Sequence, residues 1–218
     1  MIKRLIFDID NTLIPWKEEY DEVLDDVLEE IQYPHTKDLY KKISEVETEY
    51  EKKIKYFDKK EMLNYINKKL NLELPQNFID LWLKKIPYCV PKELEEDEYE
   101  TLEYLHNKYE LVALTNWFKF SQIERMKKLD ILKFFKEIYG AEKYIKPYKE
   151  SFLQAAGRYN VSECAMIGDN FEIDIKGAQN AGVKKVVWKD NHNKKDEYNK
   201  LLEDVDVITK ISELKQIF

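Results

Sequence analysis

Glycine is scarce in this chain, and the few glycines are unevenly placed. The 218 residues contain five glycines, and the first of them is Gly140. The residue that is most permissive for tight turns is therefore absent from the larger part of the chain. This distribution argues against one uniform architecture and predicts that two kinds of structure are combined.

Cysteine and histidine are also rare. The two cysteines, Cys89 and Cys164, are far apart and form no CxxC motif, which argues against a disulfide framework and a structural zinc site. We expect both thiols to be reduced and buried. The three histidines, His35, His106 and His192, show no metal-ligand spacing, so we interpret them as ordinary surface or core residues.

Long apolar runs and an excess of positive charge are both missing. No stretch approaches the roughly 20 apolar residues of a membrane span, and no signal-peptide core is present. The chain has 36 Lys and Arg against 43 Asp and Glu, a net charge of −7, which disfavours binding to a nucleic-acid backbone. We expect a folded cytoplasmic protein, a monomer or homodimer, with no nucleic-acid or membrane partner.

Residues 15–88 contain no glycine and show apolar side chains at helical spacing, which predicts a helical bundle. Prolines and one polar turn divide this segment into about four helices and mark its exit. The breaks are Pro34, Asp58 and Pro75, and the exit is at Pro87 and Pro91.

The rest of the chain alternates short apolar strands with amphipathic helices. The strand candidates are Arg4–Phe7, Leu111–Leu114, Ile138–Tyr139, Ala165–Ile167, Val186–Trp188 and Val205–Ile208. The helix candidates include Glu93–Asn107, Phe120–Leu129, Glu150–Tyr159 and Ile173–Ala181. This alternation predicts an α/β fold with a Rossmann-like parallel sheet that is covered by helices on both faces. Ligands of such sheets bind at the carboxyl ends of the strands.

Two carboxylates, Asp8 and Asp10, follow the first predicted strand in the stretch Phe7-Asp8-Ile9-Asp10-Asn11-Thr12-Leu13. In a continuing strand they would share a face, and in a loop they would still be able to converge. Clustered carboxylates repel each other unless a cation or a proton offsets their charge, which favours a hard divalent ion such as Mg²⁺. The alternative is a solvated turn with helix-capping residues.

Three further strand ends carry polar groups of the kind that phosphoryl transfer requires. Gly168-Asp169-Asn170 follows the fourth strand, where Gly168 permits a tight turn that would aim Asp169 toward Asp8; an ordinary capped turn is the alternative. Thr115-Asn116 offers a hydroxyl and backbone amides, and Lys146-Pro147 offers a cation. Both suit the equatorial oxygens of a phosphoryl group.

Taken in order, these motifs resemble those of the haloacid dehalogenase superfamily. Asp8-x-Asp10-x-Thr12 is similar to its first motif, Thr115 to the second, Lys146-Pro147 to the third, and Gly168-Asp169 with Asp174 to the fourth. The resemblance covers nearly the whole chain. It implies an α/β core formed by residues 1–14 and 89–218, and a helical cap domain formed by residues 15–88. Tyr148-Lys149 departs from the Asp-Pro that often follows the third motif.

The resemblance implies a Mg²⁺-dependent phosphomonoester hydrolase that forms an aspartyl-phosphate. Asp8 would be the nucleophile and Asp10 the general acid and base. Mg²⁺ would be held by Asp8, Asp169 and the backbone carbonyl of Asp10. The remaining roles are phosphate binding by Thr115, Asn116 and Lys146, with Thr115 and Lys146 also counted as catalytic, and support of these groups by Thr12, Asn170 and Asp174.

Asp10 favours a phosphatase over a dehalogenase, because dehalogenases lack an acid two residues after the nucleophile. A phosphomutase or phosphotransferase keeps the same acids, and a non-catalytic metal- or phosphate-binding interaction protein is the alternative from another class. The expected substrate is a small phosphorylated metabolite that the cap selects. Trp16 and Trp117 stand beside the predicted site and either contact substrate or only pack. The same two possibilities hold for Tyr40, Tyr50, Tyr56 and Tyr65.

Overall fold

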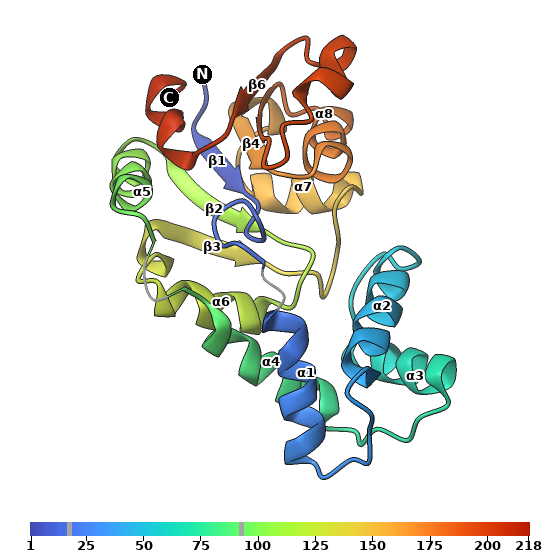
Figure 1. Ribbon diagram of the computed structural model, residues 1–218. Helices are drawn as coiled ribbons and strands as arrows, with labels where there is room; N and C mark the ends of the chain where they lie inside the picture. Colours follow the sequence, from blue (N-terminus) through green and yellow to red (C-terminus); the bar gives the residue numbers. More distant parts are fainter. Residues whose placement is uncertain (17–18, 92–93) are drawn as a thin grey trace.

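A parallel six-stranded sheet forms the centre of the molecule, with strand order β3-β2-β1-β4-β5-β6 (Figure 1). The computed structural model describes residues 1–16, 19–91 and 94–218. The strands are β1 (Arg4–Phe7), β2 (Glu110–Leu114), β3 (Phe135–Tyr139), β4 (Cys164–Gly168), β5 (Lys185–Lys189) and β6 (Val205–Ile208). The α/β fold that the sequence predicted is confirmed.

Helices cover both faces of the sheet, as expected for parallel strands that are joined through helices. Successive residues of β1 alternate between the faces: Leu5 and Phe7 belong to one apolar core and Ile6 to the other. One face packs against α5 (Glu96–Lys108), α6 (Lys119–Lys128) and the short helix η6 (Ile211–Gln216). The other packs against α7 (Lys149–Ala156) and α8 (Gly177–Ala181).

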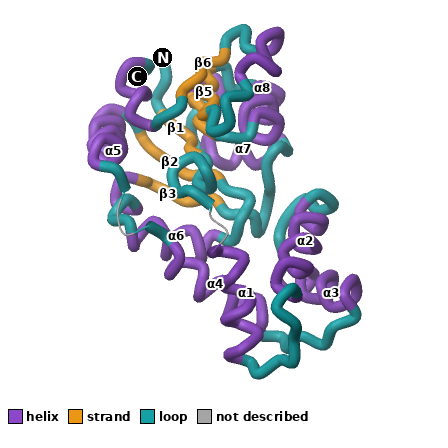
Figure 2. Tube along the Cα trace, viewed as in Figure 1, coloured by secondary structure: helices purple, strands orange, loops and turns teal. Residues whose placement is uncertain are grey.

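In the described part of the chain, four α-helices lie between β1 and α5. They are α1 (Glu19–Glu30), α2 (Leu39–Glu51), α3 (Lys59–Leu70) and α4 (Phe78–Lys85), which we call the helical layer. Figure 1 shows this layer on the side toward which the arrows of β1, β2 and β3 point, and Figure 2 shows its helices in purple in the same view. Its apolar core includes Trp117 and Phe118 from the loop after β2, so the layer packs directly against the carboxyl edge of the sheet.

The turns of the helical layer are built without glycine. Gln32, after α1, and Asn71, at the end of α3, take the left-handed backbone conformation, with φ of 54° and 53°. Asp58 precedes α3 as its N-cap, and its carboxylate accepts hydrogen bonds from the backbone N–H groups of Lys60 and Glu61, both at 2.9 Å. The predicted breaks at Pro34, Asp58 and Pro75 fall between the helices.

The structure changes some of the predicted boundaries. The predicted helix Ile173–Ala181 is a π-helix, η4 (Phe171–Lys176), that continues into α8. The bond from Ile175 N–H to the carbonyl of Asn170, at 3.4 Å, has the five-residue spacing of that wider turn. β3 begins earlier than Ile138, and the predicted helix start at Glu93 lies outside the described residues.

The expectation of two buried, reduced thiols is correct for Cys164 and wrong in part for Cys89. Neither cysteine forms a disulfide, and Cys164 is buried at the start of β4. Cys89 is only half-buried, because it ends the short helix η1 (Ile86–Cys89), in which only Ile86 and Pro87 are buried. No helix in the described part of the chain is long and apolar enough to cross a membrane.

Candidate active site

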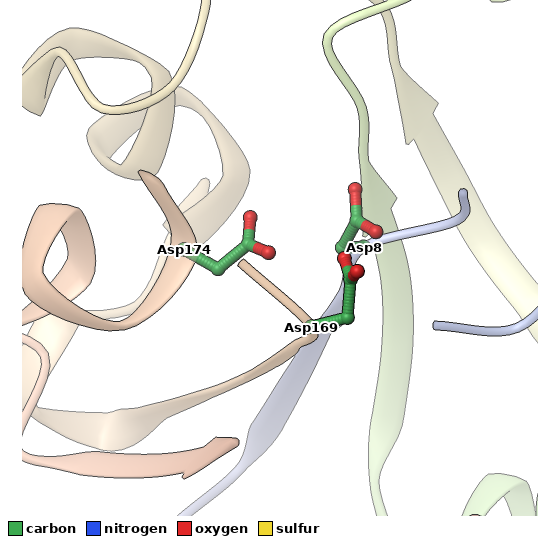
Figure 3. Close-up of side chains that lie close together, drawn as sticks. All are labelled: Asp8, Asp169 and Asp174. Carbon is green, nitrogen blue, oxygen red and sulfur yellow. The ribbon is translucent and has the colours of Figure 1, made fainter. Parts of the chain in front are cut away.

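The carboxyl ends of β1 and β4 bring Asp8 and Asp169 together. The two strands pair directly, with Phe7 opposite Ile167, and the backbone N–H of Asp8 donates to the carbonyl of Ile167 at 2.9 Å. One carboxylate oxygen from each of Asp8, Asp169 and Asp174 lies within 4.8 Å of the others (Figure 3). These acids come from two chain segments that are far apart in sequence: Asp8 follows β1, and Asp169 and Asp174 follow β4.

Asp8 is held on both of its carboxylate oxygens. Thr12 donates its hydroxyl to Oδ2 at 2.9 Å, and Lys146 donates Nζ to Oδ1 at 2.5 Å and to Asp174 Oδ1 at 2.6 Å. Burial raises the pKa of Asp8 well above its usual range; Lys146 lowers it, while Asp174 and Asp169 raise it further. Burial alone would lower the pKa of Lys146, but the two carboxylates outweigh it and the pKa is raised.

Asp169 is half-buried, whereas Asp8 and Asp174 are buried, and the pKa of its carboxyl group is shifted. Burial, followed by the charge of Asp174, raises the pKa of Asp169 to about 6. The indole N–H of Trp188 donates to the Asp169 carbonyl at 2.8 Å, which fixes the loop after β4. Lys146 pairs with two of these three carboxylates, which still leaves an excess of negative charge, and oxygen ligands of this kind fit a Mg²⁺ ion.

Gly168 allows Asp174 to approach the end of β4. A Cβ atom at position 168 would lie 2.4 Å from the carboxyl carbon of Asp174, closer than any tolerable contact. Asn170 N–H donates to Asp174 Oδ2 at 3.0 Å, and Asn170 Oδ1 caps η4 by accepting from Glu172 and Ile173 N–H. The first turn of η4 thus turns Asp174 back toward Lys146.

Asp10 lies in a separate network that the sequence analysis did not identify. Arg125 forms an ion pair with Asp10 Oδ1, and Gln122 Nε2 donates to Asp10 Oδ2 at 2.7 Å. Both partners come from α6 and are fully buried. Gln122 Nε2 also donates to Thr115 Oγ1 at 2.8 Å, and Arg125 donates to the Tyr20 hydroxyl at 3.1 Å. The network therefore joins Asp10 to the end of β2 and to helix α1.

Thr115 and Asn116 hold the loops around Lys146. Thr115 is fully buried, and its hydroxyl oxygen accepts a hydrogen bond from Gln122. Asn116 Nδ2 donates to the Lys146 carbonyl at 2.9 Å, and its Oδ1 accepts from Lys146 N–H at 2.8 Å. The same Nδ2 donates to Glu51 of α2 at 3.2 Å, which links the helical layer to the sheet edge.

A cavity of about 390 Å³ lies at the carboxyl edge of the sheet, and residues of the helical layer line one of its sides. Its lining includes most of the predicted site residues, namely Asp8, Asp10, Trp16, Asn116, Trp117, Lys146, Asp169, Asn170 and Asp174. Thr12 and Thr115 lie behind this lining. The group of carboxylates that could hold a metal ion does not include the side chain of Asp10, for which only a backbone ligand was predicted.

Trp16 and Trp117 both line the cavity and pack against neighbours, so the two interpretations of these residues do not exclude each other. Trp16 stacks on Tyr20 with ring centroids 4.4 Å apart, and Trp117 packs edge-on against Trp82 at 5.3 Å. The described lining contains none of the tyrosines considered from the sequence, Tyr40, Tyr50, Tyr56 and Tyr65.

One face of α2 also lines the cavity, and the sequence analysis did not identify it. Glu47 and Thr48 lie three and four residues after Ser44, and Glu51 lies four and three residues after them, which places all four on the same side of a helix. This spacing was a possible signal. A polar stripe on an amphipathic helix usually faces solvent, however, and only the packing of α2 turns it toward the sheet.

A parallel α/β core with an inserted helical layer and an acidic site at its strand ends defines the class of fold to which this protein belongs. The chain belongs to the haloacid dehalogenase-like hydrolase family, whose model matches residues 2–182. The resemblance noted from the four sequence motifs is confirmed.

Individual relatives match this chain more weakly. The N-acylneuraminate-9-phosphatase of Rattus norvegicus is 34% identical over 99 residues, which are 44% of this chain and 40% of the relative. The match therefore spans about two fifths of that relative's length.

Two solved structures share the fold over nearly their whole length. YfnB, a HAD-hydrolase of Bacillus subtilis bound to magnesium, superimposes with a TM-score of 0.72 at 21% identity, covering 99% of this chain and 98% of that one. The 2-haloacid dehalogenase of Pseudomonas syringae pv. Tomato DC3000 gives 0.72 at 22% identity, covering 100% and 98%. At these identities the likeness shows the fold alone.

Proposed function

We propose that the protein is a Mg²⁺-dependent phosphomonoester hydrolase that acts on a small phosphorylated metabolite through an aspartyl-phosphate. The observation that carries this proposal is the presence of two carboxylates with different partners in one cavity. Asp8 pairs with Lys146, whereas Asp10 pairs with Arg125 and Gln122. A nucleophile and a separate proton-transfer group are what ester hydrolysis requires and what halide displacement does not.

The first step transfers the phosphoryl group to the protein. A carboxylate oxygen of Asp8 forms a bond to phosphorus while the bond from phosphorus to the alcohol oxygen breaks. Asp10 donates a proton to that oxygen, because an alkoxide is a poor leaving group, and such assistance contributes about 10²- to 10⁴-fold. Thr12 and Lys146 hold the Asp8 carboxylate in place for attack.

The second step releases inorganic phosphate. Water attacks phosphorus, Asp10 takes the proton from that water, and the bond to Asp8 breaks. Lys146, the hydroxyl of Thr115 and the backbone amide of Asn116 bind the phosphoryl oxygens in both steps. Asp174 positions Lys146 through its ion pair at 2.6 Å.

Asp8, Asp169 and the backbone carbonyl of Asp10 would hold Mg²⁺, with Asp174 and Asn170 beside them. The ion supplies positive charge that offsets the repulsion between an anionic nucleophile and an anionic substrate. The acidic excess of this cluster supports the assignment. The similarity to N-acylneuraminate-9-phosphatase and to the magnesium-bound YfnB adds to it.

Hydrolysis of p-nitrophenyl phosphate with and without Mg²⁺ tests the proposal. We expect Mg²⁺-dependent release of inorganic phosphate that Asp8→Asn and Asp10→Asn each reduce by at least about 10²-fold. Asp38→Asn, at an exposed aspartate of the helical layer, is the matched control and should retain activity. Full activity of Asp8→Asn would refute the nucleophile, and metal binding without turnover on any phosphate ester would favour an interaction protein.

A phosphotransferase would give a different product pattern from the same substrate. With glycerol added as an acceptor, a hydrolase releases inorganic phosphate as the main product, whereas a phosphotransferase forms glycerol phosphate. Chloride release from 2-chloropropionate, with no phosphate ester hydrolysed, would instead indicate a dehalogenase.

A further inference from the structure

A lysine outside the cavity contacts the loop that follows β1. Lys189 ends β5, and its Nζ donates to the backbone carbonyl of Asn11 at 3.1 Å and to that of Thr12 at 3.0 Å. Lys189 is not among the described residues that line the cavity, and it takes no part in the steps proposed above. Any effect of this lysine on the reaction therefore passes through the loop that it holds.

The two carbonyls belong to a tight turn between Asp10 and Ile14. Asn11 takes the left-handed backbone conformation, with φ of 60°, and its N–H donates to the carbonyl of Ile14 at 2.8 Å. A residue other than glycine is uncommon in this conformation and keeps it where the surrounding contacts favour it. The hydrogen bonds from Lys189 are contacts of this kind, because they fix two successive carbonyls of the turn.

The turn connects Lys189 to the carboxylate of Asp8. The backbone carbonyl of Thr12 accepts from Lys189, and the hydroxyl of the same threonine donates to Asp8 Oδ2 at 2.9 Å. Thr12 and Asp8 are both buried, so water does not readily replace the bond between them. A shift of the turn would therefore move the hydroxyl that orients the proposed nucleophile.

A second side chain from the same end of β5 supports the turn. Asn191 Nδ2 donates to the carbonyl of Asn11 at 2.8 Å. Between Lys189 and Asn191 lies Asp190, which is buried and whose carboxylate accepts three backbone hydrogen bonds from the residues that follow it. The two side chains that reach the turn thus project from a segment that is fixed by its own hydrogen bonds.

The ammonium group of Lys189 also brings positive charge close to the acidic cluster. Burial lowers the pKa of Lys189, and the charges of Glu98, Asp169 and Asp8 oppose that shift. Lys189 in turn opposes the rise in the pKa of Asp169 that burial and Asp174 cause. Its charge therefore favours the ionised form of an acid that the proposed metal ion needs as a ligand.

We propose that Lys189 is a positioning residue for the reaction: it fixes the turn after β1 through two backbone carbonyls, and the turn places the Thr12 hydroxyl against Asp8. This inference rests on the proposed function. In this role Lys189 contacts neither the substrate nor the reacting atoms, and it exchanges no proton. Because Asp8 is the attacking group, loss of this support slows the formation of the aspartyl-phosphate.

Replacement of Lys189 by methionine removes both hydrogen bonds and the charge but keeps a long apolar side chain. With p-nitrophenyl phosphate at saturating Mg²⁺, we expect Lys189→Met to lower kcat by about tenfold to a hundredfold, the cost of a misplaced catalytic group, and to change KM less. Lys189→Arg restores donors and charge and should keep kcat closer to that of the parent. Lys184→Met makes the same substitution at an exposed position just before β5 and should leave kcat unchanged.

A double-mutant cycle with Thr12 tests the route from Lys189 to the nucleophile. If Lys189 acts through the Thr12 hydroxyl, Lys189→Met should lower kcat by a much smaller factor in a Thr12→Val protein than in the parent, because the effects of coupled residues are not additive. Thermal unfolding of each variant shows whether it is folded. If Lys189→Met does not fold, Lys189→Gln, which keeps an amide donor without the charge, takes its place in the same cycle.

The outcomes separate this inference from the proposed function. A parent that hydrolyses p-nitrophenyl phosphate, together with a folded Lys189→Met protein of unchanged kcat, would overturn the role of Lys189 and leave the hydrolase intact. A loss of kcat by the same factor in the parent and in the Thr12→Val protein would also overturn this role. Absence of Mg²⁺-dependent hydrolysis of every ester would overturn the hydrolase, and the role of Lys189 with it.

Discussion

Asp8 and Asp10 are two residues apart in the chain, yet each is held by different groups. Asp8 is 5% exposed and contacts Thr12 and Lys146, whereas Asp10 contacts Arg125 and Gln122. Different environments for two neighbouring carboxylates are the usual means by which one acts as nucleophile and the other transfers protons. In the proposed mechanism, Gln122 and Arg125 are positioning residues for Asp10.

Replacement of Gln122 by methionine tests this positioning. Gln122→Met removes the hydrogen bonds to Asp10 and Thr115 while filling a similar volume. Because a misplaced catalytic group costs up to about 10²-fold, we expect kcat to fall by about tenfold to a hundredfold and KM to change less. Steady-state kinetics with p-nitrophenyl phosphate measures both.

Lys127→Met, at an exposed position of the same helix, serves as the control and should leave kcat unchanged. A Gln122→Met protein that keeps its kcat would show that Asp10 needs no donor from α6. Thermal unfolding of both variants distinguishes loss of positioning from loss of the fold.

The two thiols should react differently, because burial raises the pKa of the Cys164 thiol to about 11. At pH 8 only about one Cys164 thiol in a thousand is then ionised, and the thiolate is the reactive form. We expect iodoacetamide to label Cys89 first in the folded protein, and the rate at Cys164 to rise with pH toward 11. Mass spectrometry of the Cys89→Ser protein follows Cys164 alone; rapid labelling there at pH 8 would contradict the prediction.

The sequence predicted those candidate site residues that directly follow strands. Asp8, Thr115 and Asp169 follow β1, β2 and β4, and the carboxyl ends of parallel strands share one edge. Gln122 and Arg125 were missed because polar residues inside an amphipathic helix are expected on its solvent face. Their burial depends on how α6 packs against the loop after β1, which local sequence does not encode.

At the scale of elements, prolines and capping residues located the helices well. The exception is η4, where an α-helix was expected over Ile173–Ala181 and a wider turn occurs. Helical periodicity does not distinguish the two, because the difference arises from Asn170 and Asp174, whose side chains bond to the backbone and to Lys146. π-Turns are frequent at functional sites.

The N-cap residues that precede α2 and α3 offer a matched comparison of helix capping. Asp58 accepts two backbone hydrogen bonds at the start of α3, whereas Asp38, at the start of α2, makes no side-chain capping bond. We expect Asp58→Ala to lower the free energy of unfolding by about 0.5–2 kcal/mol and Asp38→Ala to lower it by less. Urea denaturation measures both; equal losses would contradict a specific cap at Asp58.

At the scale of the whole molecule, Mg²⁺ should stabilise the folded state. A ligand that binds only the folded protein adds about 2.7 kcal/mol at a hundred times its dissociation constant. For a chain of this size, that corresponds to a rise in Tm of about 5 to 10 °C. Differential scanning fluorimetry with increasing Mg²⁺, reversed by EDTA, measures the shift.

The Asp169→Asn variant is the control for this shift. It should lose the response to Mg²⁺ and, without the metal, unfold at a higher temperature than the parent, because one charge of the repelling cluster is removed. An unchanged Mg²⁺ response in this variant would show that the ion binds elsewhere.

The sequence predicted the core of the molecule but not the orientation of the helical layer. Strand and helix alternation implies a parallel sheet, because parallel strands need crossover helices. The sequence does not determine which face of α2 meets the sheet edge. Glu45 and Glu47 are the same residue type in the same helix, but Glu47 lines the cavity and Glu45 is exposed. That choice follows from packing of the whole layer.

In the proposed mechanism, the reactive groups and the groups of the helical layer that line the cavity come from different stretches of polypeptide. The reactive groups sit on loops after β1 to β4, while α2 and α4 belong to one uninterrupted insertion between β1 and α5. Replacing the insertion between β1 and α5 by another would change the side chains that face the ligand, while the reactive groups would stay on the loops of the sheet. Such a fold is thus able to diversify in its choice of ligand by exchanging one module.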